Sequence, residues 1–205
     1  MYKIKRNEKC PCGSDKKYKK CCYLDPDKNA EIKRATSIAK TYAEAVAILS
    51  RPTEIYQIKI DLIRMGLDEI EEEISRIIEI EDKQTLFDLH NHIQHLFNWD
   101  NDHMFSFYLG EKLYDRDNEY SANPFGEHIV SGFGKQSKSA AKYELRDLNL
   151  SMGFSFWYLF DYGSELIHKV TVEKIRELKP EESGFPKLIN KKGNAPPQYG
   201  VLEEQ

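Results

Sequence analysis

Apolar positions along the chain change their period several times, and each change marks a predicted element. Between residues 29 and 50 they recur at steps of three and four, the period of an amphipathic helix. The apolar residues on this face are Ile32, Ala35, Ile38, Ala39, Tyr42, Ala45, Val46 and Leu49. Arg51-Pro52 ends the helix, because proline disfavours helical geometry in the preceding residue. The sequence does not decide whether the rest of the chain or a second chain covers this apolar stripe.

From Tyr56 the period changes to two, which predicts a half-buried strand over 56–62 that ends before Gly66. Residues 85–97 return to a helical period, and residues 74–80 fit a helix or a strand equally well. Further strands are expected at 103–109, 153–160 and 166–172, a short helix at 139–148, and irregular structure at 110–138 and 176–205.

Strands interrupted by helices indicate an α+β fold, in which an antiparallel sheet carries helices on one face. The 205 residues allow one substantial domain with a small appendage. We therefore expect a small cysteine-containing module at 1–27, a helical linker at 28–52 and an α+β domain at 53–205.

Charge is distributed unevenly along the chain. The formal net charge of the whole chain is −4, but residues 1–28 hold nine Lys and Arg against four Asp and Glu. Residues 29–205 hold 21 Lys and Arg against 30 Asp and Glu. A basic module on an acidic body can bind nucleic acid or an acidic protein surface. No apolar run approaches the ~18 residues of a membrane span, and the N-terminus lacks the apolar region of a secretion signal. The expected location is the cytoplasm.

All four cysteines lie within thirteen positions, as Cys10, Cys12, Cys21 and Cys22. Four thiolates on a short loop suit a tetrahedral Zn²⁺, and Gly13 allows the sharp turn that this spacing needs. Four thiolates and one Zn²⁺ would carry a net charge of −2, which nearby lysines offset. The alternatives are two disulfides or a redox switch, although a bond between neighbouring cysteines would strain the backbone.

The segment from Cys10 to Cys22 resembles the SEC-C motif, a zinc-binding tail first recognised in the preprotein translocase motor SecA. The resemblance covers about the first 25 residues and implies a structural zinc ion and a docking role, not protein export. The partner-binding residues selected on this basis are Lys16, Lys17, Tyr18, Lys19 and Lys20. The alternative is that these lysines only compensate the charge of the metal site.

Residues from about 56 to 200 resemble the plasmid pRiA4b ORF-3-like family, which includes passenger proteins of mobile elements. The matching segments are 86–90, 97–105, 158–163 with His168, and 195–197. The chain departs from the family pattern at Ser75, Ser164, Leu166 and Gln198-Tyr199. The resemblance implies a fold but no activity.

Catalytic chemistry has little support in the sequence, which shows no phosphate loop, nucleophile elbow or zinc-protease motif. His90, His103, Asp161 and His168 are the candidates for an acid–base or second metal site, and His92 and His95 could chelate a metal. The alternative places His90 in the core row of its helix and lets His103 and His168 orient loops at strand starts.

Three functions follow. The first is a non-enzymatic, zinc-binding adaptor that docks a protein partner, with no small-molecule substrate and no membrane. The second is nucleic-acid binding through the basic module. The third is an enzyme that uses the histidines and Asp161.

Overall fold

The computed structural model describes residues 2–122 and 137–199. The chain divides into two compact units, Met1–Pro52 and Thr53–Gln205, which we call the N-terminal and the C-terminal unit.

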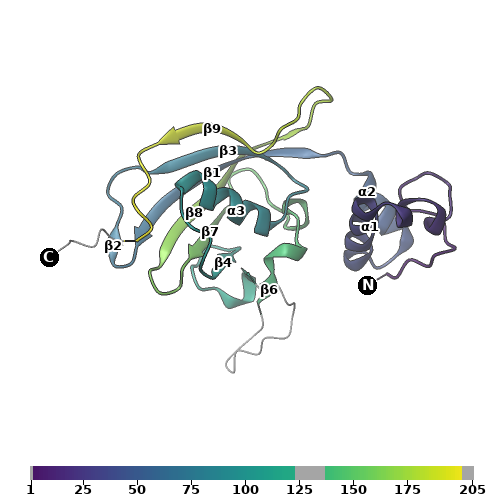
Figure 1. Ribbon diagram of the computed structural model, residues 1–205, viewed down its shortest axis with the longest axis horizontal. Helices are drawn as coiled ribbons and strands as arrows, with labels where there is room; N and C mark the ends of the chain where they lie inside the picture. Colours follow the sequence, from purple (N-terminus) through teal and green to yellow (C-terminus); the bar gives the residue numbers. More distant parts are fainter. Residues whose placement is uncertain (1, 123–136, 200–205) are drawn as a thin grey trace. The chain divides into compact units, whose positions relative to one another are not determined.

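The N-terminal unit begins with an extended segment and two 3-10 turns, Tyr18–Lys20 and Cys22–Leu24. Two helices follow, α1 (Pro26–Ile38) and α2 (Tyr42–Ser50) (Figure 1). The prediction of one helix over 29–50 is therefore wrong. The chain is extended at Ala39, and the Thr41 side chain accepts a hydrogen bond from the Glu44 backbone N–H, which starts a new helix.

Much of the apolar stripe of these helices is covered within the same unit, although Ile38 is 41% exposed. Ile32 of α1 is 2% exposed and packs in one buried cluster with Cys10, Tyr18 and Cys22, and Leu49 of α2 packs against that cluster. The segment predicted as a linker therefore helps to build the core around the cysteines.

The C-terminal unit holds a mixed, mostly antiparallel sheet, with nine strands in the part of the chain that the structure describes. The bounds of the strands are β1 Glu54–Met65, β2 Asp68–Glu69, β3 Ser75–Glu81, β4 Phe105–Tyr108, β5 Glu119–Ser121, β6 Lys138–Ser139, β7 Ser155–Phe160, β8 Leu166–Glu177 and β9 Lys187–Lys192. Their order is β6-β5-β4-β7-β8-β1-β3-β9, and β2 pairs with the end of β1. The pair β5 and β6 is parallel and the other pairs are antiparallel.

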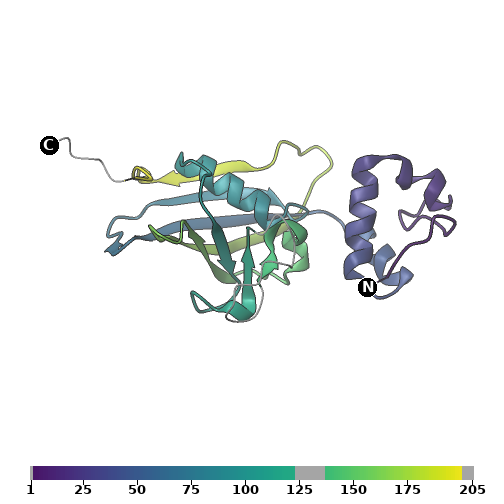
Figure 2. The ribbon, with the colours of Figure 1, turned by 60° about the horizontal axis from the view of Figure 1, so that its bottom comes forward.

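Helix α3 (Leu86–Phe97) packs on one face of this sheet, and β9, β3 and β1 curve around it (Figures 1 and 2). Its buried residues Leu86, Leu89, Ile93 and Phe97 join the core-facing residues of the central strands in one cluster. The expected α+β class is confirmed, and the sheet is mostly antiparallel apart from the pair β5 and β6.

Several local predictions differ from the structure. Residues 74–80 form strand β3, and the helix expected at 139–148 is wrong, because this segment holds part of β6 and two 3-10 turns. The backbone N–H of Leu145 donates to the Gln84 carbonyl at 2.9 Å, and that of Arg146 donates to the Asp82 carbonyl at 3.0 Å. These hydrogen bonds hold the second turn against the residues just before α3. Strands β5 and β9 fall in segments predicted to be irregular.

Among the helices described, none is both long and apolar enough to cross a membrane.

Candidate metal centre

A tight loop brings the first two cysteines toward the second two. Lys9 and Lys17 form an antiparallel bridge, and the Cys10 backbone N–H donates to the Lys16 carbonyl at 2.7 Å. Between them the chain turns through Gly13, which has a φ of +83°, and Asp15, which has a φ of +57°. A positive φ is easily reached by glycine and tolerated by aspartate, so the sequence of this loop suits its shape.

The four cysteine sulfurs converge at the base of this loop. All of them lie within 4.8 Å of one another, with 3.6 Å between Cys12 and Cys21 and 3.9 Å between Cys21 and Cys22. A tetrahedral ion with sulfur ligands at about 2.3 Å separates those sulfurs by about 3.8 Å. The cysteines are free, and the shorter of the two separations far exceeds the roughly 2.05 Å of a disulfide bond. The arrangement therefore fits a metal ion better than two disulfides.

The cluster is half enclosed. Cys10 and Cys22 are 1% and 5% exposed, because they belong to the core of the N-terminal unit, whereas Cys12 faces solvent. Burial raises the pKa of Cys10 and Cys22 above the usual value. Burial also tends to raise the pKa of Cys12, but hydrogen bonds with Ser14 and the neighbouring cysteines outweigh it and lower this pKa to about 6. One thiolate is thus favoured before any ion binds.

Ser14 was not selected from the sequence, although it contacts the sulfurs. Its Oγ lies 3.0 Å from Cys21 Sγ and 3.3 Å from Cys12 Sγ. A hydroxyl between two thiolates can donate to one of them, which stabilises negative charge on sulfur.

The residues selected as a partner surface separate into two groups. Lys16, Lys17 and Lys20 are exposed, and Lys19 is half-buried. Tyr18, in contrast, is 3% exposed and packs edge-on against Tyr23 in the core of the N-terminal unit, while its hydroxyl donates to Asn29. Its aromatic ring therefore builds the module and is not displayed beside the lysines.

His90 packs as a core residue of the C-terminal unit. It is fully buried, lies 2.6 Å from the Tyr158 hydroxyl through Nδ1 and 2.6 Å from Asn101 through Nε2, and stacks on Phe105. Burial, partly offset by the hydrogen bond with Asn101, lowers its pKa to about 4. The interpretation of His90 as a hydrogen-bonded core residue is confirmed.

His168 is also fully buried, since it lies within β8 opposite Tyr158. Its ring is enclosed by Phe97, Trp99 and Tyr158, and burial lowers its pKa to about 3. The expectation that His168 orients a loop at a strand start is wrong, because the strand extends two residues before it.

His103 and Asp161 do come together, near the start of β4 and the end of β7. His103 Nε2 lies 3.7 Å from both Asp161 Oδ2 and Asp102 Oδ1, and 3.3 Å from the Tyr199 hydroxyl. His90 and His168 are sealed in the core, so the hypothesised site of four residues does not form. His92 pairs with Gln84, and within the described residues only the cysteines gather as three or more potential metal ligands.

A sequence profile of the plasmid pRiA4b ORF-3-like protein family matches residues 54–199. The chain belongs to this family. A second profile, that of the SEC-C motif, matches residues 6–24, which contain all four cysteines. The protein thus joins a SEC-C motif to a pRiA4b ORF-3-like domain.

Two curated proteins resemble short stretches of the chain. The protein translocase subunit SecA of Acetivibrio thermocellus is 74% identical over 23 residues, and an uncharacterized protein, YccF, of Bacillus subtilis is 77% identical over 22 residues. Each match covers 11% of this chain, and the matched stretches are 2% and 6% of those proteins. The similarity is thus confined to a motif-sized segment.

A solved structure resembles the fold over a much larger share of the chain. The crystal structure of a protein of unknown function from Methanosarcina mazei Go1 matches with a TM-score of 0.55 and 22% identity, over 72% of this chain and 74% of that one. This likeness supports the fold alone.

Proposed function

We propose that the protein is a non-enzymatic adaptor, in which a structural zinc ion shapes a small module that docks a protein partner. The observation that carries the proposal is the convergence of four sulfurs within 4.8 Å. Four thiolates complete the coordination of a structural Zn²⁺ and leave no position for a substrate. The metal would then hold the loop, with Lys16, Lys17, Lys19 and Lys20 around it, in one conformation.

The metal part of the proposal is tested by measuring bound metal. We expect about one zinc per chain in the purified protein, by elemental mass spectrometry, and much less in Cys21→Ser. Ser14→Ala is the matched control, because it removes a hydroxyl at the same sulfurs but no ligand. A wild-type protein that folds normally without any zinc, or that binds a different metal, would contradict this part.

The docking part is tested by affinity capture from native lysate with the wild type and with Cys21→Ser, each with and without nuclease. We expect a protein that is retained by the wild type, survives nuclease and is lost with Cys21→Ser. Identical captured proteins for both variants would rule out zinc-dependent docking.

Nucleic-acid binding is the second candidate, favoured by the exposed lysines of the loop. Lys16, Lys17 and Lys20 make no ion pair within the described residues. Binding through such lysines would weaken steeply with salt. The absence of any gel shift at about 50 mM salt would count against it.

A further inference from the structure

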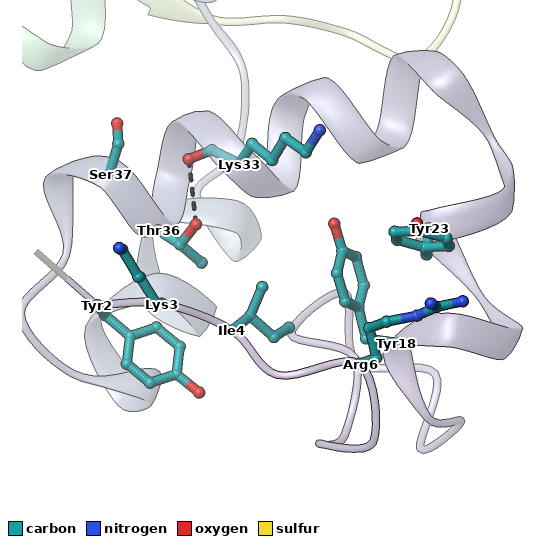
Figure 3. Close-up of a pocket in the computed structure, with 9 residues that line it drawn as sticks. All are labelled: Tyr2, Lys3, Ile4, Arg6, Tyr18, Tyr23, Lys33, Thr36 and Ser37. Atoms are coloured by element: carbon teal, nitrogen blue, oxygen red, sulfur yellow. Dashed lines mark hydrogen bonds between the residues drawn. The ribbon is translucent and has the colours of Figure 1, made fainter.

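A groove in the N-terminal unit lies between the first residues of the chain and α1, and has a volume of about 350 Å³. We call it the basic groove. Figure 3 shows Lys33, Thr36 and Ser37 on the helix, with Ile4, Arg6 and Tyr18 opposite them. The full lining is Tyr2, Lys3, Ile4, Arg6, Tyr18, Tyr23, Lys33, Thr36 and Ser37.

The lining combines positive charge with aromatic surface and contains no carboxylate. Lys3, Arg6 and Lys33 make no ion pair within the described residues, and the Arg6 guanidinium lies 4.8 Å from the ring centre of Tyr23. The unit around the groove holds 13 Lys and Arg against 6 Asp and Glu over residues 1–52. Such a surface favours an anionic segment that also presents an apolar side chain.

The C-terminal unit displays a segment of that kind, the turn and strand from Gly66 to Glu73, which we call the acidic hairpin. Leu67 at its tip is 97% exposed. Asp68, Glu69, Glu71 and Glu72 are exposed as well, and no ion pair engages them in the described parts of the chain. Glu73 differs, since it pairs with Lys59 and Lys192.

The acidic hairpin is held in place by backbone hydrogen bonds. Gly66 turns the chain with a φ of +61° and donates its N–H to the Ser164 carbonyl at 2.8 Å. Ile70 N–H donates to the Ile63 carbonyl at 2.9 Å. A segment that is already ordered loses less conformational entropy when it binds.

We propose that the acidic hairpin of a second copy of this chain docks in the basic groove. Leu67 enters the groove against Ile4 and the exposed side of Tyr23, and the four unpaired carboxylates face Lys3, Arg6 and Lys33. The charges are opposite, and the exposed Leu67 supplies the apolar contact that a surface ion pair alone lacks.

The test is the self-association of the full zinc-loaded chain, measured by sedimentation at several protein concentrations. We expect association at about 50 mM salt that weakens about tenfold or more at about 500 mM, because salt screens exposed charges. The groove variant Arg6→Glu with Lys33→Glu, and the hairpin variant Asp68→Lys with Glu72→Lys, should each weaken self-association about tenfold or more.

Mixing the two variants should restore association between them, because the groove variant keeps the acidic hairpin and the hairpin variant keeps the basic groove. Lys40→Glu with Lys174→Glu is the matched control, because it changes the net charge as the groove variant does but touches neither surface. Zinc content is measured in every variant, so that loss of the module is recognised separately. A single molecular mass at all concentrations, or reversed variants that do not restore association when mixed, would overturn the proposal.

Discussion

Arg76 is a guanidinium enclosed in the C-terminal unit, where it is 1% exposed. Its Nη1 donates to the carbonyls of Ser75, Lys192 and Gly193 at 2.7, 3.0 and 3.2 Å, and its Nε donates to the Leu96 carbonyl at 3.1 Å. Burial lowers its pKa from the usual value. Carbonyl dipoles, including one from the C-terminal turn of α3, thus take the place of a carboxylate partner.

Removing this cation should leave several buried carbonyls without a donor. We expect Arg76→Met to lower the free energy of unfolding by about 3 kcal/mol, measured by urea denaturation. Lys191→Met on the neighbouring strand is the control and should change it by less than about 0.5 kcal/mol, since Lys191 is exposed. Equal effects of the two substitutions would contradict the role given to Arg76.

The two buried histidines should make folding sensitive to acid. Their pKa values fall from about 6.5 to about 4 at His90 and about 3 at His168, because burial disfavours the charged ring. The unfolded chain then binds more protons below pH 6.5, so stability is full above that pH and is lost as the pH falls. We expect each histidine to lower the free energy of unfolding by about 2–3 kcal/mol at about pH 4.5 relative to neutral pH.

Substitution separates this effect from that of the carboxylates. The slope of unfolding free energy against pH between about 4.5 and 6.5 should decrease in His168→Phe. It should be unchanged in His95→Gln, because His95 is exposed on α3. An unchanged slope in His168→Phe would show that His168 does not contribute to acid sensitivity.

At the scale of elements, α3 shows how side chains fix the start of a helix. Thr85 accepts a hydrogen bond from the Asp88 backbone N–H at 3.1 Å, and the Asp88 side chain accepts from the Thr85 backbone N–H at 2.8 Å. This reciprocal pair satisfies two donors that the first turn leaves free. At the other end Asn98 takes a left-handed conformation with a φ of +55°.

Loss of this cap should be measurable because α3 covers the core. We expect Thr85→Ala to lower the free energy of unfolding by about 1 kcal/mol, and Thr85→Ser to preserve most of it, by thermal or urea denaturation. A serine variant as unstable as the alanine variant would indicate that the methyl group of Thr85 matters more than its hydroxyl.

Elements with a strong period could be predicted from the sequence, and those fixed by distant contacts could not. β1 alternates apolar and polar residues, and α3 repeats apolar residues at helical spacing. The sequence therefore predicts both elements close to their observed positions. β9 is stabilised chiefly by its backbone pairing with β3, and its side chains leave little pattern. The break between α1 and α2 depends on one threonine, which a continuous helical period conceals.

At the scale of the whole molecule, the two units have separate cores. The N-terminal core consists of Cys10, Tyr18, Cys22 and Ile32 with a few half-buried neighbours, whereas the C-terminal core is far larger. A core of that size rarely supports folding alone, so the module should depend on its metal.

A strong zinc chelator should therefore unfold one unit only. We expect α1 and α2 to lose hydrogen-exchange protection after chelation, while β1, β8 and α3 keep theirs. Restoring zinc should restore protection, which distinguishes metal loss from damage by the chelator. Unchanged exchange in both helices would show that the module folds without a metal.

The candidate metal site could be predicted from four cysteines and their spacing, because that signal is local in the sequence. The basic groove could not, since it joins Tyr2 and Lys3 to Lys33, which meet only after α1 packs on the first residues. Likewise, the contact between His103 and Asp161 depends on the pairing of β4 with β7.

Strand β9 ends the sheet beside β3, and its outer edge pairs with no strand among the described residues. Leu188 and Ile189 on this strand are 51% and 50% exposed, and Lys187, Lys191 and Lys192 surround them. An open edge with apolar residues can recruit a strand from another molecule and start aggregation, and lysines oppose this by mutual repulsion and by their need for water. Because Lys192 pairs with Glu73, the protection of this open edge against pairing with another molecule falls mainly to Lys187 and Lys191, on a strand that takes no part in the metal site.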